Sequence, residues 1–172
     1  MRKGYVQVYT GNGKGKTTAA LGLAVRAAGA GMRTFIAQFI KKKKCSEHAL
    51  LEELNDRITI RQYGKGFLLR KKPSAADIQA AKAGYQQVKE KLLSREYEVV
   101  ILDEANVAVH YGLISAQDIL DLIAVKPKSV ELVITGRYAC DQVVAAADLV
   151  TEMREVKHYR QKGVEARRGI EK

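Results

Sequence analysis

Residues 5–20 read YVQVYTGNGKGKTTAA, and this stretch decides the fold. Aromatic and β-branched residues, which favour strands, run into a turn rich in glycine, and alanines that favour a helix follow it. At a strand-to-helix junction of this kind, glycines let backbone N–H groups close on the oxygens of an anion. The pattern therefore predicts a phosphate-binding loop.

The loop ends in Gly15-Lys16-Thr17, which offers a lysine charge to phosphate and a hydroxyl to a metal ion. One position departs from the usual pattern. The glycine expected five residues before the Gly-Lys pair is Thr10, and Gly11 and Gly13 provide the flexibility instead. A lysine-rich surface turn is the simpler alternative, but it predicts no acidic strand end further along the chain. We expect the following residues to bind a nucleotide: Gly11, Asn12, Gly13, Lys14, Gly15, Lys16, Thr17 and Thr18.

An acidic strand end does occur downstream. Residues 99–102 form a continuous apolar run, as expected for a strand that is covered on both faces, and Asp103-Glu104 follow it. A triphosphate needs a divalent ion to offset its charge, and carboxylates at a strand end can hold that ion or orient a group beside the phosphates. We therefore expect Thr17, Asp103 and Glu104 to form a site for magnesium or manganese.

Composition sets wider limits on the function. The 172 residues fit a single domain, 1–172, with a basic tail at 157–172. Thirty lysines and arginines against 19 acidic residues give a net charge of +11, which favours anionic partners without choosing among nucleotide, nucleic acid and phosphorylated metabolite. Cys45 and Cys140 lie far apart and predict neither a disulfide framework nor a zinc site. No apolar run is long enough for a signal peptide or a membrane span, so we expect a cytoplasmic protein.

Strands and helices are expected to alternate along the chain. After the first strand, further strands are expected at 33–40, 58–63, 99–102, 131–135 and 149–156. Helices are expected at 17–28, 45–55, 115–124 and 141–147, and a longer one is expected to start at Ser74 with Asp77 three positions on. This order predicts an α/β fold of the P-loop NTPase (RecA-like) type, with a mostly parallel central sheet and helices on both faces.

Several polar residues have open roles at this level. The lysine run 41–44 is either a solvated loop or part of the rim that meets an anionic substrate, because it follows a strand end. Arg137 also follows a strand end, and it could contact phosphate or form a structural ion pair. His48 and His110 have no ligand spacing and receive no role. His158 could face the site or the solvent.

Short motifs spread over the chain resemble the P-loop type of ATP:corrinoid adenosyltransferase. They are YTGNGKGKTTAA at 9–20, QFIK at 38–41, GKGF at 64–67, ILDE at 101–104, ITGR at 134–137, DLVTEM at 148–153, KHY at 157–159 and GVEARRGIE at 163–171. The matches run in order over almost the whole chain. The departure at Thr10 is itself what this family shows.

The resemblance implies transfer of the 5′-deoxyadenosyl group of ATP to the cobalt(I) of a reduced corrinoid, such as cob(I)alamin or a precursor, with release of triphosphate. Cobalt is then the nucleophile, and no side chain need act as one. Lys16, Thr17 and Glu104 become the residues on which catalysis depends most. Arg137 and Arg26 become candidates for nucleotide contact, although a solvated helix arginine is an equal alternative for Arg26.

The chain departs from this family on the corrinoid side. It has no tryptophan, and Leu68-Leu69 stand where many relatives carry Thr-Trp, so Phe67 is the aromatic candidate for corrinoid contact. The resemblance further suggests a homodimer and admits a flavin-type reductant protein, with neither nucleic acid nor membrane as a partner. A RecA-like, nucleic-acid-stimulated ATPase and a small-molecule kinase are the alternative functions.

Overall fold

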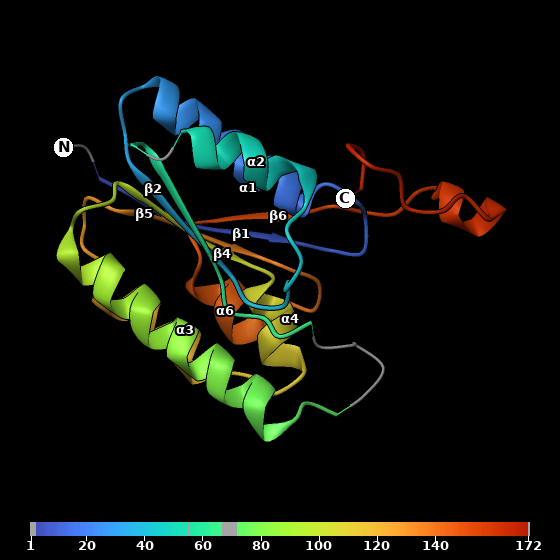
Figure 1. Cartoon of the computed structure of the whole chain (residues 1–172). Coiled ribbons are helices and arrows are strands. Elements are labelled where there is room, and N and C mark those ends of the chain that lie inside the picture. The colour runs from blue at the N-terminus through green and yellow to red at the C-terminus, as the bar shows by residue number, and fades with distance from the viewer. Residues whose placement is uncertain (1–2, 55, 67–71, 172) are drawn as a thin grey trace.

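A six-stranded parallel sheet in the order β3-β2-β4-β5-β1-β6 forms the centre of the protein (Figure 1). The structure is a computed structural model that describes residues 3–54, 56–66 and 72–171. The strands are β1 (Val6–Thr10), β2 (Thr34–Gln38), β3 (Ile58–Gln62), β4 (Val99–Asp103), β5 (Glu131–Thr135) and β6 (Leu149–Glu152). The expected parallel sheet is confirmed.

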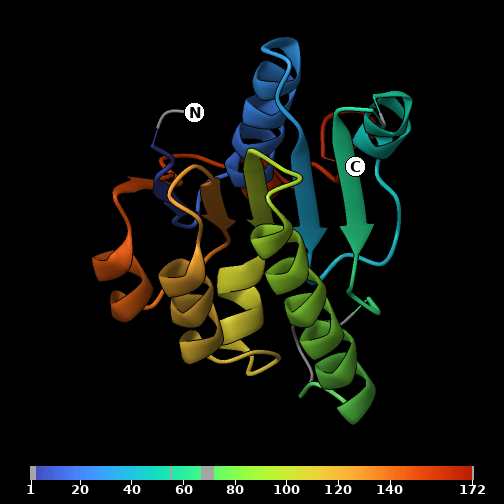
Figure 2. The same ribbon diagram turned by 90° about the vertical axis from the view of Figure 1, so that its left-hand side faces the viewer.

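Helices cover both faces of the sheet, as expected (Figure 2). One face carries α1 (Lys16–Gly29) and α2 (Ser46–Glu53). The other carries α3 (Ala75–Ser94), α4 (Ala105–His110), α5 (Ala116–Val125) and α6 (Asp141–Ala146). Among the described helices, none combines the length and the apolar character needed to cross a bilayer.

Alternation along the central strands produces two cores. Val100 and Leu102 of β4 point into the core on the α3 side, and Ile101 between them points into the core on the α1 side. All five residues of β4 are buried, which is why the sequence there is continuously apolar rather than alternating. Small side chains on α1, such as Ala20 and Ala24, let that helix lie close to the sheet.

Capping boxes of a serine and an aspartate begin α3 and α5. The Ser74 hydroxyl accepts a hydrogen bond from the Asp77 N–H, and the Asp77 carboxylate accepts one from the Ser74 N–H. Ser115 and Asp118 repeat this capping box at the start of α5. Both starts agree with expectation, since a capping box is a local signal that needs no information from the rest of the fold.

The end of the chain differs from the sequence-based expectation. Strand β6 ends at Glu152 instead of extending to residue 156, because its partner β1 ends at Thr10, where the phosphate-binding loop turns away. One further hydrogen bond, from the Met153 N–H to the Thr10 carbonyl, closes the ladder. The chain then runs outward into a short 3₁₀ helix, Tyr159–Lys162, and returns towards α1 (Figure 1).

Helix α4 was not expected from the sequence. It has six residues, of which four are buried, so it is too short and too evenly covered to show a helical apolar stripe. It begins directly after Asp103 and Glu104, at the carboxyl end of the central strand β4.

A prediction on stability follows from the contact between α3 and the residue after β3. A Cβ atom on Gly84 would lie 2.5 Å from Cγ of Tyr63. We expect Gly84→Ala to lower the free energy of unfolding by about 1–3 kcal/mol, because overpacking forces the two elements apart. The measurement is chemical denaturation.

Gly22→Ala is the matched control for that substitution. Gly22 also lies inside a helix, but a Cβ there would meet no atom within 4 Å. The gain in helix propensity should raise the free energy of unfolding by about 0.5–1 kcal/mol. If both substitutions stabilised the protein, Tyr63 would not pack against Gly84 as described above.

Candidate functional site

The phosphate-binding loop joins β1 to the N-terminus of α1 and is held by the segment that follows β6. The Gly13 N–H donates to the Met153 carbonyl over 2.6 Å. Cβ atoms on Gly11 and Gly13 would lie 2.5 and 2.7 Å from that carbonyl oxygen. Gly11 and Gly15 also have φ values of +91° and +119°, which favour glycine. The close backbone contact therefore requires glycine at positions 11 and 13, and the backbone conformation of the turn favours glycine at positions 11 and 15.

Lys16 lies across the inside of this loop. Its Nζ donates to the carbonyls of Gly11 and Gly13 over 2.7 and 2.6 Å, and only 7% of the residue is exposed. Burial lowers the pKa of Lys16, and the nearby Arg137 lowers it further, while Glu104 acts in the opposite direction. The ammonium group thus rests on carbonyl oxygens that phosphate oxygens could replace.

Asp103, at the end of β4, is the centre of a buried polar network. Its Oδ1 accepts hydrogen bonds from the hydroxyls of Thr17 and Thr135 over 2.8 and 2.9 Å. Its Oδ2 accepts one from Nε2 of Gln38 over 3.0 Å and lies 3.7 Å from Nζ of Lys41. The carboxylate is fully buried, so these groups replace the water that an exposed carboxylate would have.

Glu104 follows in a backbone conformation that is rare for residues other than glycine. Its φ is +60°, and its N–H donates to the Thr135 hydroxyl over 3.0 Å. Burial raises the pKa of Glu104, the charge of Asp103 raises it further, and the Lys41 and Lys16 ammonium groups oppose both effects. Backbone strain of this kind is found preferentially at functional sites, where the surrounding structure holds it in place.

The donors gathered here suit magnesium. Thr17 brings a hydroxyl, and Asp103 and Glu104 bring two carboxylates. All are hard oxygen ligands, and two adjacent carboxylates, one fully buried, leave negative charge that a divalent cation would neutralise. The residues present therefore fit a magnesium ion shared with phosphate oxygens.

A cavity of about 720 Å³ opens beside the loop. Its polar end is formed by the loop, Glu104, Arg137 and Lys41. Side chains of α1 and α2 provide an apolar wall of Leu21, Val25, Leu50 and Leu51. The chain end closes another side with His158 and residues 169–171, and Nζ of Lys14 donates to the Ile170 carbonyl over 3.1 Å.

The structure brings most of the predicted site residues to this cavity. Those that line it are Gly13, Lys14, Gly15, Lys16, Thr17, Thr18, Glu104 and Arg137. Asp103 lies directly behind Thr17, joined to it by a hydrogen bond. Arg137 is exposed and, among the described residues, forms no salt bridge, which leaves its guanidinium available to an anion.

Other predicted residues lie elsewhere. Gly11 and Asn12 belong to the loop but do not line the cavity. Arg26, in the last turn of α1, is exposed and is not part of the cavity wall, so nothing in the geometry favours its nucleotide contact. Phe67, the candidate for corrinoid contact, lies outside the described residues.

Some site residues had no assigned role or an open one. Lys41 lies between Glu47 at 3.6 Å and Asp103 at 3.7 Å, so the first lysine of the run belongs to the site rather than to a solvated loop. Burial disfavours its charge, but Asp103 and Glu47 together raise the pKa of Lys41. Gln38 and Thr135 end β2 and β5, the two parallel strands on either side of β4. That strand-end position is the one sequence signal that could have marked them.

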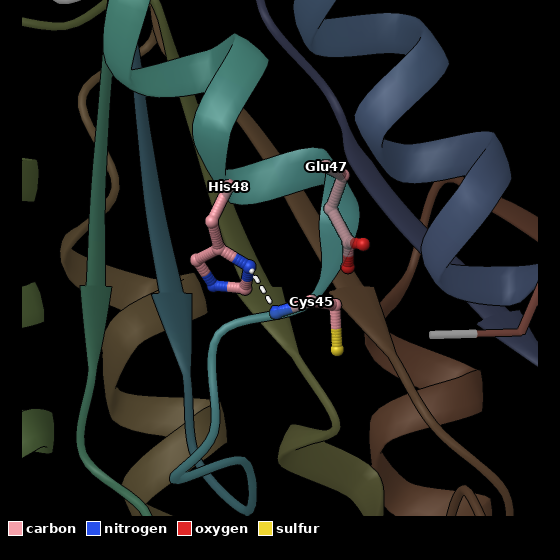
Figure 3. A group of neighbouring side chains, drawn as sticks. All are labelled: Cys45, Glu47 and His48. Atoms are coloured by element: carbon pink, nitrogen blue, oxygen red, sulfur yellow. Dashed lines mark hydrogen bonds between the residues drawn. The ribbon is translucent and has the colours of Figure 1, made fainter. Parts of the chain in front are cut away.

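The first turn of α2 brings Cys45, Glu47 and His48 together (Figure 3). Their possible ligand atoms all lie within 4.8 Å of one another. Both ring nitrogens of His48 are already engaged, however: Nδ1 accepts from the Cys45 N–H over 3.0 Å, and Nε2 is 2.9 Å from Oε1 of Gln38. The imidazole is therefore part of a hydrogen-bonded helix start, not a free ligand.

Comparison with known proteins relates this chain to one enzyme family. Residues 2–171 match the model of the family described as ATP:corrinoid adenosyltransferase BtuR/CobO/CobP. A corrinoid adenosyltransferase of Pseudomonas aeruginosa is 34% identical over 98% of this chain and 84% of its own length. The corrinoid adenosyltransferase CobA of Salmonella typhimurium is 35% identical over 98% of this chain and 86% of its own length.

A solved structure supports the fold alone. A KaiC-like protein of Pyrococcus horikoshii superposes with a TM-score of 0.57 at 15% identity, covering 90% of this chain and 74% of its own. The fold is the α/β fold of RecA-like P-loop NTPases, as expected from the sequence.

A prediction on pH follows from the raised pKa of Glu104. The folded protein holds the proton of this carboxyl more tightly than the unfolded chain does. The group therefore contributes stability that is complete below its ordinary pKa of about 4.3 and is lost as the pH rises through the raised pKa. In metal-free and nucleotide-free protein, Glu104→Gln should therefore raise the unfolding midpoint at pH 8. The gain should shrink as the pH approaches 4. Thermal unfolding at several pH values measures both effects.

Glu53→Gln is the control, because Glu53 is exposed at the end of α2. It should leave the midpoint almost unchanged at every pH. A destabilising effect of Glu104→Gln at pH 8 would mean that the charged carboxylate is favoured in the free protein, against the direction given above.

Proposed function

The chain belongs to the ATP:corrinoid adenosyltransferase family, and we propose how its residues share the work of that reaction. The adenosyl group of ATP is transferred to a corrinoid. Cobalt(I) of the reduced corrinoid attacks C5′ of ATP, a cobalt–carbon bond forms, and the C5′–O bond breaks with its electron pair leaving on triphosphate. The triphosphate is therefore the leaving group, and the protein must hold it and neutralise its charge.

One observation carries the residue assignment: Lys16 and Thr17 line the polar end of one cavity, and the buried Asp103, directly behind Thr17, accepts a hydrogen bond from its hydroxyl. Helix α1 starts at Lys16, so the unpaired N–H groups of its first turn add an anion-binding helix N-terminus at the same end of the cavity. In our proposal the loop and Lys16 bind the triphosphate and stabilise the negative charge that grows on it as the C5′–O bond breaks. Arg137 contacts the same phosphates from the end of β5.

Thr17, Asp103 and Glu104 would hold the magnesium ion, or manganese in its place. When bound, the ion supplies positive charge to the phosphate oxygens. Asp103 is held by hydrogen bonds before any ligand arrives, so the oxygen donors do not need to be ordered at the moment of binding.

The apolar wall of the cavity suits the less charged part of the substrates. Leu21 and Val25 of α1 face Leu50 of α2 across a space continuous with the phosphate end. We propose that the nucleoside and the neighbouring edge of the corrinoid lie along this wall, which excludes water from the reacting carbon. The role of Phe67 in corrinoid contact stays a prediction.

The assembly and setting of the protein belong to the same proposal. By analogy with the family, we propose a homodimer that works in the cytoplasm and receives its corrinoid reduced by a flavin-type protein. Size measurement in solution tests the dimer directly.

Product identity tests the function. The protein is incubated with ATP, magnesium and chemically reduced corrinoid, and we expect adenosylated corrinoid together with intact triphosphate. ADP without a cobalt–carbon bond would indicate a small-molecule kinase instead. Inorganic phosphate whose release increases with DNA or RNA in a salt-sensitive manner would indicate a nucleic-acid-stimulated ATPase.

A substitution of Lys16 tests the role of the loop. Lys16→Ala removes charge-assisted hydrogen bonds worth about 1.5–3 kcal/mol, so the affinity for MgATP should fall about 10- to 100-fold and turnover should fall with it. Titration calorimetry measures the binding and circular dichroism checks the fold. Lys43→Ala, in the exposed part of the lysine run, is the control and should bind normally. Normal turnover of Lys16→Ala would place the site elsewhere.

A further inference from the structure

We propose that His48 is a positioning residue for Asp103 and acts on it through Gln38. The inference rests on the proposed function, because that function assigns Asp103 to the magnesium site. All three side chains are buried: 2% of His48 is exposed, and Gln38 and Asp103 are completely covered. A buried histidine that lines no ligand cavity has no evident purpose in the reaction unless it acts on another group.

The backbone determines which nitrogen of His48 carries the proton. Nδ1 lies 3.0 Å from the Cys45 backbone nitrogen, and a backbone N–H can only donate (Figure 3). Nδ1 is therefore the acceptor, and the proton of the neutral ring is on Nε2. That N–H points at Oε1 of Gln38, 2.9 Å away, and donates to it.

This donation in turn determines the orientation of the Gln38 amide. Its Oε1 accepts from His48 and also from Nε2 of Gln62 at 3.2 Å, so two donors hold the oxygen on that side. The Nε2 group of Gln38 must then face the other way, where it donates to Oδ2 of Asp103 over 3.0 Å. Every hydrogen bond from Cys45 to Asp103 thus has one possible direction.

The Asp103 carboxylate keeps its position only if the Gln38 amide keeps this orientation. If the Gln38 amide turned over, its oxygen would face Oδ2 of Asp103, and two acceptors would meet in a buried place. The carboxylate would have to rotate, which would move Oδ1 away from Thr17 and disturb the oxygen donors of the metal site. Groups that orient a metal ligand from behind commonly change metal affinity about 10- to 100-fold when they are removed.

The opposing explanation is that His48 only caps helix α2. The Cys45 contact would then be its whole role, and loss of His48 would lower stability without changing nucleotide binding. The two contacts of the ring allow these explanations to be separated, because Nδ1 makes the cap and Nε2 makes the link to Gln38.

Two amide substitutions divide the ring in this way. In His48→Asn, the side-chain oxygen can take the place of Nδ1 and keep the cap, but the side chain is too short to reach Gln38. In His48→Gln, the side-chain nitrogen can take the place of Nε2 and keep the link, while the cap is lost. Titration calorimetry with ATP, in magnesium and in EDTA, measures the binding of each, and chemical denaturation measures the stability.

We expect His48→Asn to weaken MgATP binding about tenfold or more, with a much smaller effect in EDTA, and His48→Gln to bind MgATP nearly as the unaltered protein does. Val88→Ala, on α3 at the opposite face of the sheet, is the control for destabilisation alone and should bind MgATP normally. Equal binding by the Asn and Gln variants, or weaker binding by the Gln variant, would overturn the proposal.

A double substitution tests the route through Gln38. If His48 acts only through this amide, the His48→Asn, Gln38→Leu double variant should bind MgATP no more weakly than Gln38→Leu alone. Additive losses would show that His48 does not act through Gln38 and would overturn the proposal. If the unaltered protein itself failed to bind MgATP, the proposed function would fall first, and the comparison of variants keeps that outcome distinct.

Discussion

A carboxylate buried among strand ends is the constraint on which the rest of the site depends. Asp103 is shielded from solvent, so its charge must be met inside the protein. The hydroxyls of Thr17 and Thr135 and the amide of Gln38 meet it, and each comes from a different element. These groups reach one carboxylate because β4 lies between β2 and β5, and β5 lies beside β1. The strand order and the oxygen donors of the proposed metal site are therefore one arrangement, and a change in either would disrupt the other.

The phosphate-binding loop depends on a second long-range contact. The Met153 carbonyl follows the last strand, accepts from the Gly13 N–H and leaves no room for a Cβ on Gly11 or Gly13. The chain end then returns to line the cavity, where the Ile170 carbonyl accepts from Lys14. The two ends of the chain thus build one site, which explains why motifs near both ends accompany the family's chemistry.

The elements that were predicted well are those with local causes. The capping box of Ser74 and Asp77 and the apolar run before Asp103 each depend on neighbours in sequence, and both were confirmed. The end of β6 was not, because a strand stops where its partner stops, and the sequence of β6 does not contain the end of β1. Lys41 could not be told apart from the three lysines after it, because its pairing with Asp103 depends on how two parallel strands end side by side.

The amino-acid order alone was sufficient to identify a nucleotide loop, an acidic strand end and the family, because glycine conformation, strand and helix periodicity and motif order are properties of nearby residues. It could not say that Thr135 would hold Asp103, that Arg26 would lie away from the cavity, or that the proton of His48 would be on Nε2. Each of these depends on the direction of a side chain relative to elements far away in sequence. Only packing against those elements selects that direction, because the local backbone allows several.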